Sequence, residues 1–269
     1  MIKIIFSDMD GTLLTDDNRL PPDFDEVVAE LKKRGVIFSP TSGRQYFSLL
    51  KSFTKYENEF IFIADGGTFA LQKGKELFSF TMTHENVAKL LRFAEKNMPG
   101  VAPVFCGKKF AYLQKDMVTP EIKAEIATYF SEVQVVDNLE DVEDVSLKMS
   151  FFDFTNHAKE TILDKLLAEF TEGFDIVQTS PCWVDVYTPG VNKGLAVKTL
   201  QEKLNVKPEE CAAFGDYMND YEMLQSVGYG YAMQNARPEI KKVAKFQTVS
   251  NNEYGVTVAI KKFIADGLI

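Results

Sequence analysis

The chain has 269 residues, and 45% of them are apolar, which suits one large domain or a core with an inserted domain. Its net charge is −9 at pH 7. A chain this acidic, without a basic stripe, is poorly suited to nucleic acid or to an anionic membrane surface, so we expect neither as a partner.

Composition also narrows the kinds of site that the chain can carry. The cysteines Cys106, Cys182 and Cys211 are odd in number and widely spaced, which predicts buried free thiols rather than disulfides or a cysteine zinc site. With only two histidines, a histidine metal site and a Ser-His-Asp triad are disfavoured. The chain starts directly with a strand pattern, and no apolar run approaches the ~20 residues that span a bilayer, so we expect a cytoplasmic protein.

The first predicted strand, residues 4–7, ends in two acids. It is an apolar run typical of a fully buried strand, and Asp8 and Asp10 follow it before Gly11 turns the chain. Two acids this close repel unless a cation or a proton intervenes, which favours a hard divalent ion such as magnesium. A plain Asp-Gly turn is the structural alternative. A calcium loop is excluded, because the acid, glycine and glutamate that it requires are replaced by Thr12, Leu13 and Arg19.

A strand, helix and strand unit begins a parallel sheet. Helical spacing of apolar residues predicts a helix within 22–34, and a buried strand is predicted at 36–38. The second strand ends in Ser42 and Gly43, just before a predicted helix near 47–53. A hydroxyl and free N–H groups there suit a phosphate, although an ordinary helix cap is the alternative. A third strand is predicted at 60–64, with a hairpin beyond residues 65–68.

Residues 83–187 are predicted to form a separate inserted α/β domain. Residues 84–187 carry 10 Lys and Arg against 18 Asp and Glu, and therefore −8 of the net charge of −9. The pattern in this segment predicts alternating helices and paired strands. The expected helices are 84–97, 120–131 and 158–171, and the expected strands lie near 103–113, 133–137, 145–154, 174–178 and 183–187.

The core pattern resumes with a helix that opens at Lys193. A cation at a helix N-terminus is mildly unfavourable, which makes sense if an anion binds there, although a solvated surface lysine is the alternative. A small buried strand at 211–214 is followed by a second acid pair, Asp216 and Asp220. A strand at 227–233 and helices at 238–243 and 254–264 close the chain. We therefore predict a Rossmann-like parallel-sheet core formed by residues 1–82 and 188–269.

A doubly wound sheet brings these strand and helix ends into one crevice. The acids there can hold a hard cation, and Ser42, N–H groups and Lys193 can hold an anion that bridges to it, which is the equipment of phosphoryl transfer. With these motifs in this order, the whole chain resembles the haloacid dehalogenase superfamily of phosphohydrolases. It resembles most its Cof-type branch, whose cap domain is inserted between the second and third motifs.

The resemblance implies roles for the acids. Asp8 would be the nucleophile that forms an aspartyl phosphate, and Asp10 would act as general acid and base. A Mg²⁺ ion would be held by the Asp8 carboxylate, the Asp10 backbone carbonyl and Asp216, with Asp220 and Asn219 supporting the ion and its waters. The expected activity is hydrolysis of small phosphomonoesters, such as sugar phosphates, by a monomer or weak homo-oligomer.

The resemblance also implies a phosphate-binding set. Ser42, the Gly43 N–H group and Lys193 would bind the transferring oxygens, and Asn219 is grouped with them. Tyr217 stands where the family often has a small hydroxyl residue, so we expect it to narrow the site.

Three other functions compete with hydrolysis. A sugar-phosphate phosphotransferase or mutase would use the same nucleophile and pass the phosphoryl group to a second substrate. A dehalogenase is disfavoured among them, because its chemistry needs neither a proton donor at Asp10 nor a metal. A non-catalytic phosphate-binding protein would keep the fold without the reaction.

Overall fold

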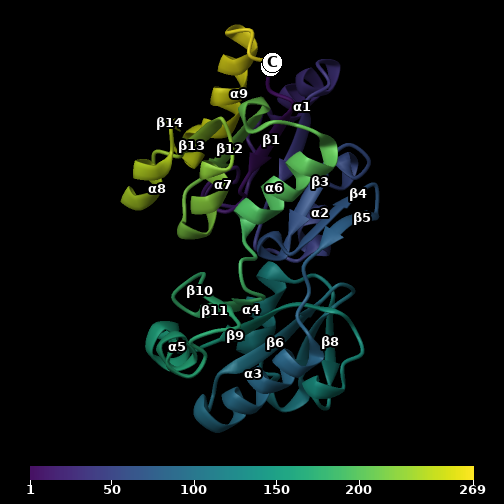
Figure 1. Ribbon diagram of the computed structural model, residues 1–269, viewed down its shortest axis with the longest axis vertical. Helices are drawn as coiled ribbons and strands as arrows, with labels where there is room; N and C mark the ends of the chain where they lie inside the picture. The colour runs from purple at the N-terminus through teal and green to yellow at the C-terminus, as the bar shows by residue number, and fades with distance from the viewer. The chain divides into compact units, whose positions relative to one another are not determined.

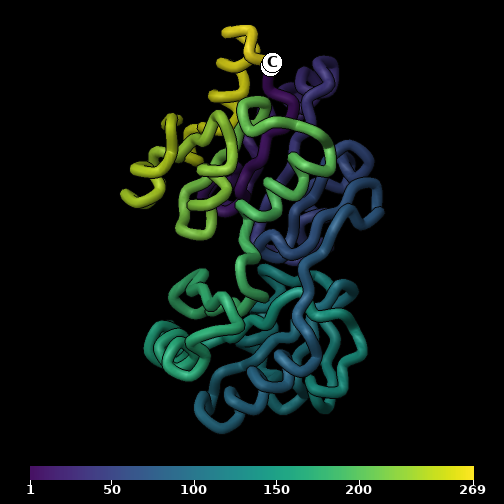
Figure 2. The backbone as a smooth tube through the Cα atoms, in the orientation of Figure 1, coloured from purple at the N-terminus to yellow at the C-terminus, as the bar shows by residue number.

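The computed structural model describes all 269 residues, Met1–Ile269, which divide into two compact units. The first unit comprises Met1–Gly43, Phe53–Leu77 and Asn192–Ile269, and the second comprises Arg44–Ser52 and Phe78–Val191. Figure 2 traces the backbone through both units in order of residue number.

The segment Arg44–Ser52 belongs to the second unit, whereas the sequence pattern places it in the core. The backbone N–H of Gln45 donates to the Tyr129 carbonyl at 3.3 Å. The Oε1 atom of Gln45 accepts from the backbone N–H groups of Ser131 at 3.2 Å and of Glu132 at 3.3 Å. These contacts join residues more than 80 positions apart, which local sequence patterns do not report.

The first unit is built on a five-stranded parallel sheet in the order β14-β13-β12-β1-β2. Every residue of the central strand β1 is buried, as its apolar run predicts. The predicted α/β core with a parallel sheet is thereby confirmed. The strands are β1 (Ile4–Ser7), β2 (Ile37–Pro40), β12 (Cys211–Gly215), β13 (Tyr229–Ala232) and β14 (Phe246–Gln247).

Five helices accompany this sheet. In the first helix the predicted apolar stripe is buried, and this helix packs against α9, while α6 packs closely against α7. Figure 1 shows α6 in front of the strands of its unit. The helices are α1 (Phe24–Lys33), α6 (Lys193–Leu204), α7 (Tyr221–Gln225), α8 (Pro238–Val243) and α9 (Gly255–Ala265).

The third predicted strand belongs to a second, smaller sheet. The strands β3 (Ile61–Ala64), β4 (Phe69–Gln72) and β5 (Lys75–Ser79) lie in that order, and β3 and β4 are antiparallel. A single bridge between Thr41 and Ile63 connects β3 to the chain that leaves β2.

The second unit is built on a six-stranded sheet in the order β10-β11-β9-β6-β7-β8. All neighbours are antiparallel except β7 and β8, which are parallel. The strands are β6 (Ala102–Gly107), β7 (Ala111–Gln114), β8 (Val133–Val136), β9 (Ser146–Phe152), β10 (Asp175–Gln178) and β11 (Trp183–Tyr187).

Helices cover both faces of this sheet. One apolar cluster joins Phe105, Met149 and Val186 to α3 and α5, and a second joins Val104 and Trp183 to α4. The helix expected at 158–171 begins instead with a π-helical turn, Lys159–Leu163. The helices are α2 (Tyr46–Ser52), α3 (His84–Asn97), α4 (Pro120–Tyr129) and α5 (Asp164–Glu169).

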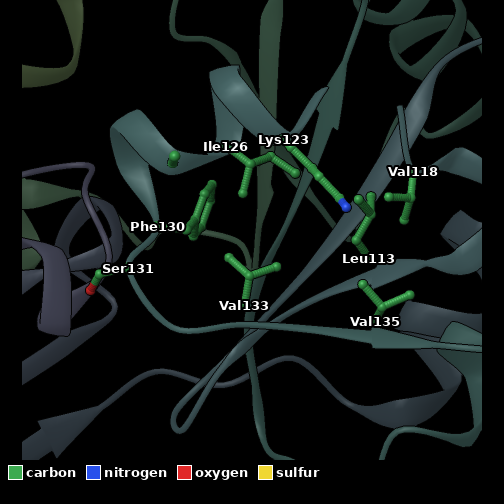
Figure 3. A pocket seen from close by; sticks show the side chains of 9 residues that line it. Leu113, Val118, Lys123, Ile126, Phe130, Ser131, Val133 and Val135 are labelled. Atoms are coloured by element: carbon green, nitrogen blue, oxygen red, sulfur yellow. The ribbon is translucent and has the colours of Figure 1, made fainter. Parts of the chain in front are cut away.

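A pocket of about 320 Å³ lies between α4 and strands β7 and β8. Figure 3 shows apolar side chains around it, among them Leu113, Ile126 and Val133, with the Lys123 ammonium at its side. None of the residues predicted to be catalytic, phosphate-binding or metal-binding lines this pocket.

The longest helix of the protein, α3, has 14 residues, and no helix combines the length and apolar character needed to cross a membrane.

Candidate active site

The carboxyl ends of β1 and β12 lie side by side where the order of the sheet reverses. The chain runs outward from β1 to β2 on one side, and from β12 to β13 and β14 on the other. The Asp8 N–H donates to the Phe214 carbonyl at 3.0 Å, so the pairing of the two strands continues to Asp8. Ligands of open α/β sheets bind at such a switch point. The acids that follow the two strands, Asp8 and Asp216, are therefore brought to the expected place.

Lys193 joins the two acid pairs. Its Nζ atom lies 2.6 Å from Asp8 Oδ1 and 2.7 Å from Asp220 Oδ1, and its side chain is 0% exposed. It is the first residue of α6, whose N-terminus is capped by Asn192 Oδ1, the acceptor of the Leu195 N–H. Two charge-assisted hydrogen bonds offset the cost of a cation at this helix end. Lys193 is thus not the solvated surface lysine of the alternative interpretation.

Asp220 is held on both of its carboxylate oxygens. Oδ1 accepts from Lys193, and Oδ2 accepts from the N–H groups of Asp216 at 3.0 Å and Tyr217 at 3.2 Å. The carboxylate folds back over Gly215, where a Cβ atom would lie 2.5 Å from the Cβ of Asp220. Asp220 therefore organises the loop that carries Asp216 and fixes the ammonium of Lys193.

Asp216 is held by the turn that follows Asp8. Thr12 Oγ1 donates to Asp216 Oδ1 at 2.7 Å. Gly11, at φ +75°, packs on the same carboxylate, and a Cβ atom at position 11 would lie 2.5 Å from Asp216 Oδ2. A side chain at position 11 would therefore clash with the acid that the turn has to approach.

The charges in this cluster shift one another's pKa values. Burial raises the pKa of Asp8 well above its ordinary value, opposed by the Lys193 ammonium and reinforced by the carboxylates of Asp220 and Asp216. Burial and the Asp220 charge raise the pKa of Asp216 to about 6, opposed by the hydrogen bond from Thr12. Burial lowers the pKa of Lys193, but Asp220 and Asp8 outweigh it and raise that pKa above its ordinary value.

This donor set fits a hard divalent cation. One carboxylate oxygen from each of Asp8, Asp216 and Asp220 lies within 4.8 Å of the others. Burial and the neighbouring carboxylates raise the pKa values of Asp8 and Asp216, and a bound cation would favour the ionised form of both acids. Magnesium takes one or two protein carboxylates and keeps several waters, which suits Asp8 and Asp216, since both oxygens of Asp220 have donors.

The other predicted residues lie on neighbouring loops of the same unit. Asp10 is exposed in the turn after Asp8 and forms a bridge with Leu14. Ser42 is 1% exposed and follows β2, where the Thr41 N–H donates to the Ser7 carbonyl at 2.8 Å, next to the end of β1. Its own N–H donates to the Ile63 carbonyl at 2.9 Å.

Gly43, Asn219 and Tyr217 complete the predicted set. Gly43 is half-buried directly after Ser42, and Asn219 is half-buried in the 3₁₀ turn Met218–Asp220. The Tyr217 ring lies under the guanidinium of Arg237, whose Cζ is 4.4 Å from the ring centroid.

Two residues with clear contacts at the site are missing from the sequence prediction. Thr12 binds Asp216 directly, and Asn235 Nδ2 donates to the Gly11 carbonyl at 2.7 Å. Both are short polar residues just beyond a strand end of the parallel sheet, Thr12 after β1 and Asn235 after β13. That position is the signal by which the sequence could have identified them.

Known proteins match the chain over nearly its whole length. The family described as haloacid dehalogenase-like hydrolase matches residues 5–260. An Escherichia coli protein named 5-amino-6-(5-phospho-D-ribitylamino)uracil phosphatase is 31% identical over 268 residues, covering 98% of this chain and 96% of that protein. The Bacillus subtilis phosphatase YwpJ is 23% identical over 287 residues, covering 98% of this chain and 100% of that protein.

The fold has a close counterpart among solved structures. A crystal structure of a Streptococcus mutans protein superposes with a TM-score of 0.90 at 26% identity, covering 98% of this chain and 100% of that one. These matches confirm the resemblance derived from the motifs around Asp8 and Asp216. The chain therefore belongs to the haloacid dehalogenase-like hydrolase family, within which it is a phosphatase.

Proposed function

We propose that the protein hydrolyses small phosphomonoesters in a magnesium-dependent reaction that passes through an aspartyl phosphate on Asp8. The observation that carries this proposal is the contact of Asp8 with Lys193, on one side of a carboxylate cluster that includes Asp216. This group of side chains brings a nucleophile, a fixed cation and a set of hard metal ligands into one small volume.

The first step transfers the phosphoryl group to Asp8. A carboxylate oxygen of Asp8 attacks phosphorus as the bond to the leaving oxygen breaks, and Asp10 gives that oxygen its proton. The Lys193 ammonium favours the ionised, nucleophilic form of Asp8 against the effect of burial. Ser42, the Gly43 N–H group and Lys193 are the proposed donors to the phosphoryl oxygens.

The second step releases inorganic phosphate. Asp10, now a carboxylate, takes a proton from water, whose oxygen attacks phosphorus and breaks the bond to Asp8. A Mg²⁺ ion would be held by Asp8, the Asp10 backbone carbonyl and Asp216. It would neutralise charge on the transferring group. Asn219 and Asp220 support this arrangement from the loop after β12.

The proposed substrate class is a phosphorylated sugar or a similar polyhydroxylated metabolite. The support is the relative at 31% identity, whose name specifies a phosphorylated ribityl chain. The second unit, as the predicted cap, would select the part of the substrate that is not phosphate. Its excess of acids disfavours leaving groups with several negative charges.

The test is phosphate release from a panel of sugar phosphates, nucleotides and cofactor phosphates, in Mg²⁺ and in chelator. Wild type and Asp8→Asn are compared with Asp17→Asn, an exposed acid of the same loop. We expect release to require Mg²⁺ and Asp8 and to survive Asp17→Asn. Release that is unchanged in Asp8→Asn would disprove the proposed nucleophile, and transfer to an acceptor other than water as the main outcome would identify a phosphotransferase.

A further inference from the structure

A short segment after β13 contacts both acid loops of the site. The Met233 N–H donates to the Gly215 carbonyl at 3.2 Å, and the Arg237 N–H donates to the Asp216 carbonyl at 3.0 Å. Between these two contacts, Asn235 Nδ2 donates to the Gly11 carbonyl at 2.7 Å. The segment thus spans the distance between the loop that carries Asp216 and the turn that follows Asp8.

Asn235 is itself fixed from the other side. Its Oδ1 accepts from the Asn251 N–H at 3.1 Å. Asn251 is 2% exposed, and its Nδ2 donates to the Leu14 carbonyl at 3.0 Å and to Asp16 Oδ1 at 2.9 Å. The two asparagines therefore hold the turn at its beginning and at its end. An amide suits position 235, because one side chain has to donate to a carbonyl and accept from an N–H group.

The carbonyl held by Asn235 belongs to the peptide that contacts Asp216. Gly11 packs on the Asp216 carboxylate, and the next residue, Thr12, donates to it. A movement of the Gly11–Thr12 peptide would therefore move the hydrogen-bond donor of Asp216 and change the space between Asp216 and Asp8. The contacts of Lys193 with Asp8 and Asp220 do not involve this peptide.

We propose that Asn235 is a positioning residue for the cation site: by holding the Gly11 carbonyl, it sets the spacing of Asp8 and Asp216. This inference rests on the proposed function, which places a divalent cation between these two acids. It predicts an effect on the affinity for the cation rather than on the binding of phosphate.

The side chain of Asn235 is exposed, so its replacement removes no part of the hydrophobic core. Asn235→Ala removes both hydrogen bonds, and Asn235→Leu removes them while keeping a branched side chain. The matched control is Asn252→Ala. Asn252 binds Asp16 at the far end of the same turn, through Nδ2 to Oδ2 at 2.8 Å, and makes no hydrogen bond to Gly11.

The experiment measures Mg²⁺ binding to the full-length protein by isothermal titration calorimetry, together with phosphate release from p-nitrophenyl phosphate as a function of Mg²⁺. We expect both Asn235 variants to bind Mg²⁺ about tenfold more weakly, a usual effect for residues that orient metal ligands. We also expect their KM for the ester at saturating Mg²⁺ to stay within about twofold of wild type, and Asn252→Ala to match wild type.

Three outcomes would overturn the inference. Unchanged Mg²⁺ affinity in both Asn235 variants, with wild type active, rejects it and leaves the proposed function intact. Equal weakening in Asn252→Ala assigns the effect to general loosening of the turn and also rejects it. A wild-type protein that neither binds Mg²⁺ nor releases phosphate rejects the proposed function, and the inference with it.

Discussion

The ammonium of Lys193 lies 2.6 Å from Asp8 Oδ1, and it is buried with no exposed side-chain surface. The same ammonium reaches Asp220 Oδ1 at 2.7 Å. A buried cation held by two buried carboxylates is a pre-organised charge arrangement, because none of the three groups can turn to bulk water. The expected effects of mutations at this site follow from that arrangement.

Lys193→Met should reduce both stability and activity. It leaves Asp8 and Asp220 buried without their shared cation, so we expect the free energy of unfolding in chelator to fall by about 3–5 kcal/mol. Phosphate release should fall by about 100-fold or more, since a fixed donor is lost. Urea unfolding and steady-state kinetics test this, with Lys198→Met on the exposed side of α6 as control. Equal losses in both variants would contradict a special role for Lys193.

Binding of Mg²⁺ should weaken as the pH falls through about 6. The pKa of Asp216 is raised to about 6 and that of Asp8 is raised as well, so protons compete with the metal in this range. Below pH 6 the affinity should fall by about tenfold per pH unit for each proton displaced. Calorimetric titrations between pH 5 and pH 8 measure this slope, and a flat profile would show that Asp216 is no ligand.

In the metal-free protein, Asp216 should contribute the opposite trend to stability. A carboxylate with a raised pKa in the folded state stabilises the fold at low pH, and this contribution is lost as the pH rises from about 4 towards 6. Carboxylates with lowered pKa values, such as Asp23 and Asp25, act in the opposite direction, so the contribution of Asp216 is measured against Asp216→Asn, which does not titrate. In chelator, the melting temperature of wild type minus that of Asp216→Asn should decrease from pH 4 to pH 6. A difference that is constant or rises over this range would contradict the expectation.

Thr12→Val should weaken metal binding by about tenfold with little loss of stability. The substitution keeps the shape of the side chain and removes the hydrogen bond to Asp216 Oδ1. Since that bond lowers the pKa of Asp216, the pH at which Mg²⁺ binding fails should move upward. Thr15→Val is the control, because the Thr15 hydroxyl contacts only the backbone of Arg19. The same pH shift in the control would refute the assignment to Thr12.

Gly11→Ala should abolish activity, because the new methyl group clashes with Asp216 in addition to straining the backbone. Both Gly11 and Gly35 have positive φ angles, +75° and +70°, so alanine at either position should cost about 1–2 kcal/mol. At Gly35 the new methyl group meets no atom within 4 Å, whereas at Gly11 it meets Asp216 Oδ2 at 2.5 Å. Comparing kcat/KM and melting temperature for the two variants separates strain from the clash. Equal activities would show that the approach of Gly11 to Asp216 is unimportant.

The sequence was sufficient to predict the strand and helix ends that position the proposed site residues. The apolar run before Asp8 predicts a buried strand, and β1 is buried throughout, because a strand covered on both faces needs apolar residues at every position. The unfavourable place of Lys193 at a helix N-terminus left a solvated surface lysine open, and the family resemblance gave it a role. In the structure it contacts two carboxylates. The inserted segment stood out by its acidity, while its role as a cap stays a prediction.

Contacts between distant parts of the chain came from the folded structure alone. Three features join residues that no local pattern relates: the grouping of Arg44–Ser52 with the second unit, the hydrogen bond from Lys193 to Asp220, and the link from Asn235 to Gly11. Hydrophobic periodicity and motif spacing report the neighbours of a residue along the chain, and so they determined which acids end the strands. Which donor holds each acid depends on the sheet order, which brings β1 next to β12 across about 200 residues of sequence.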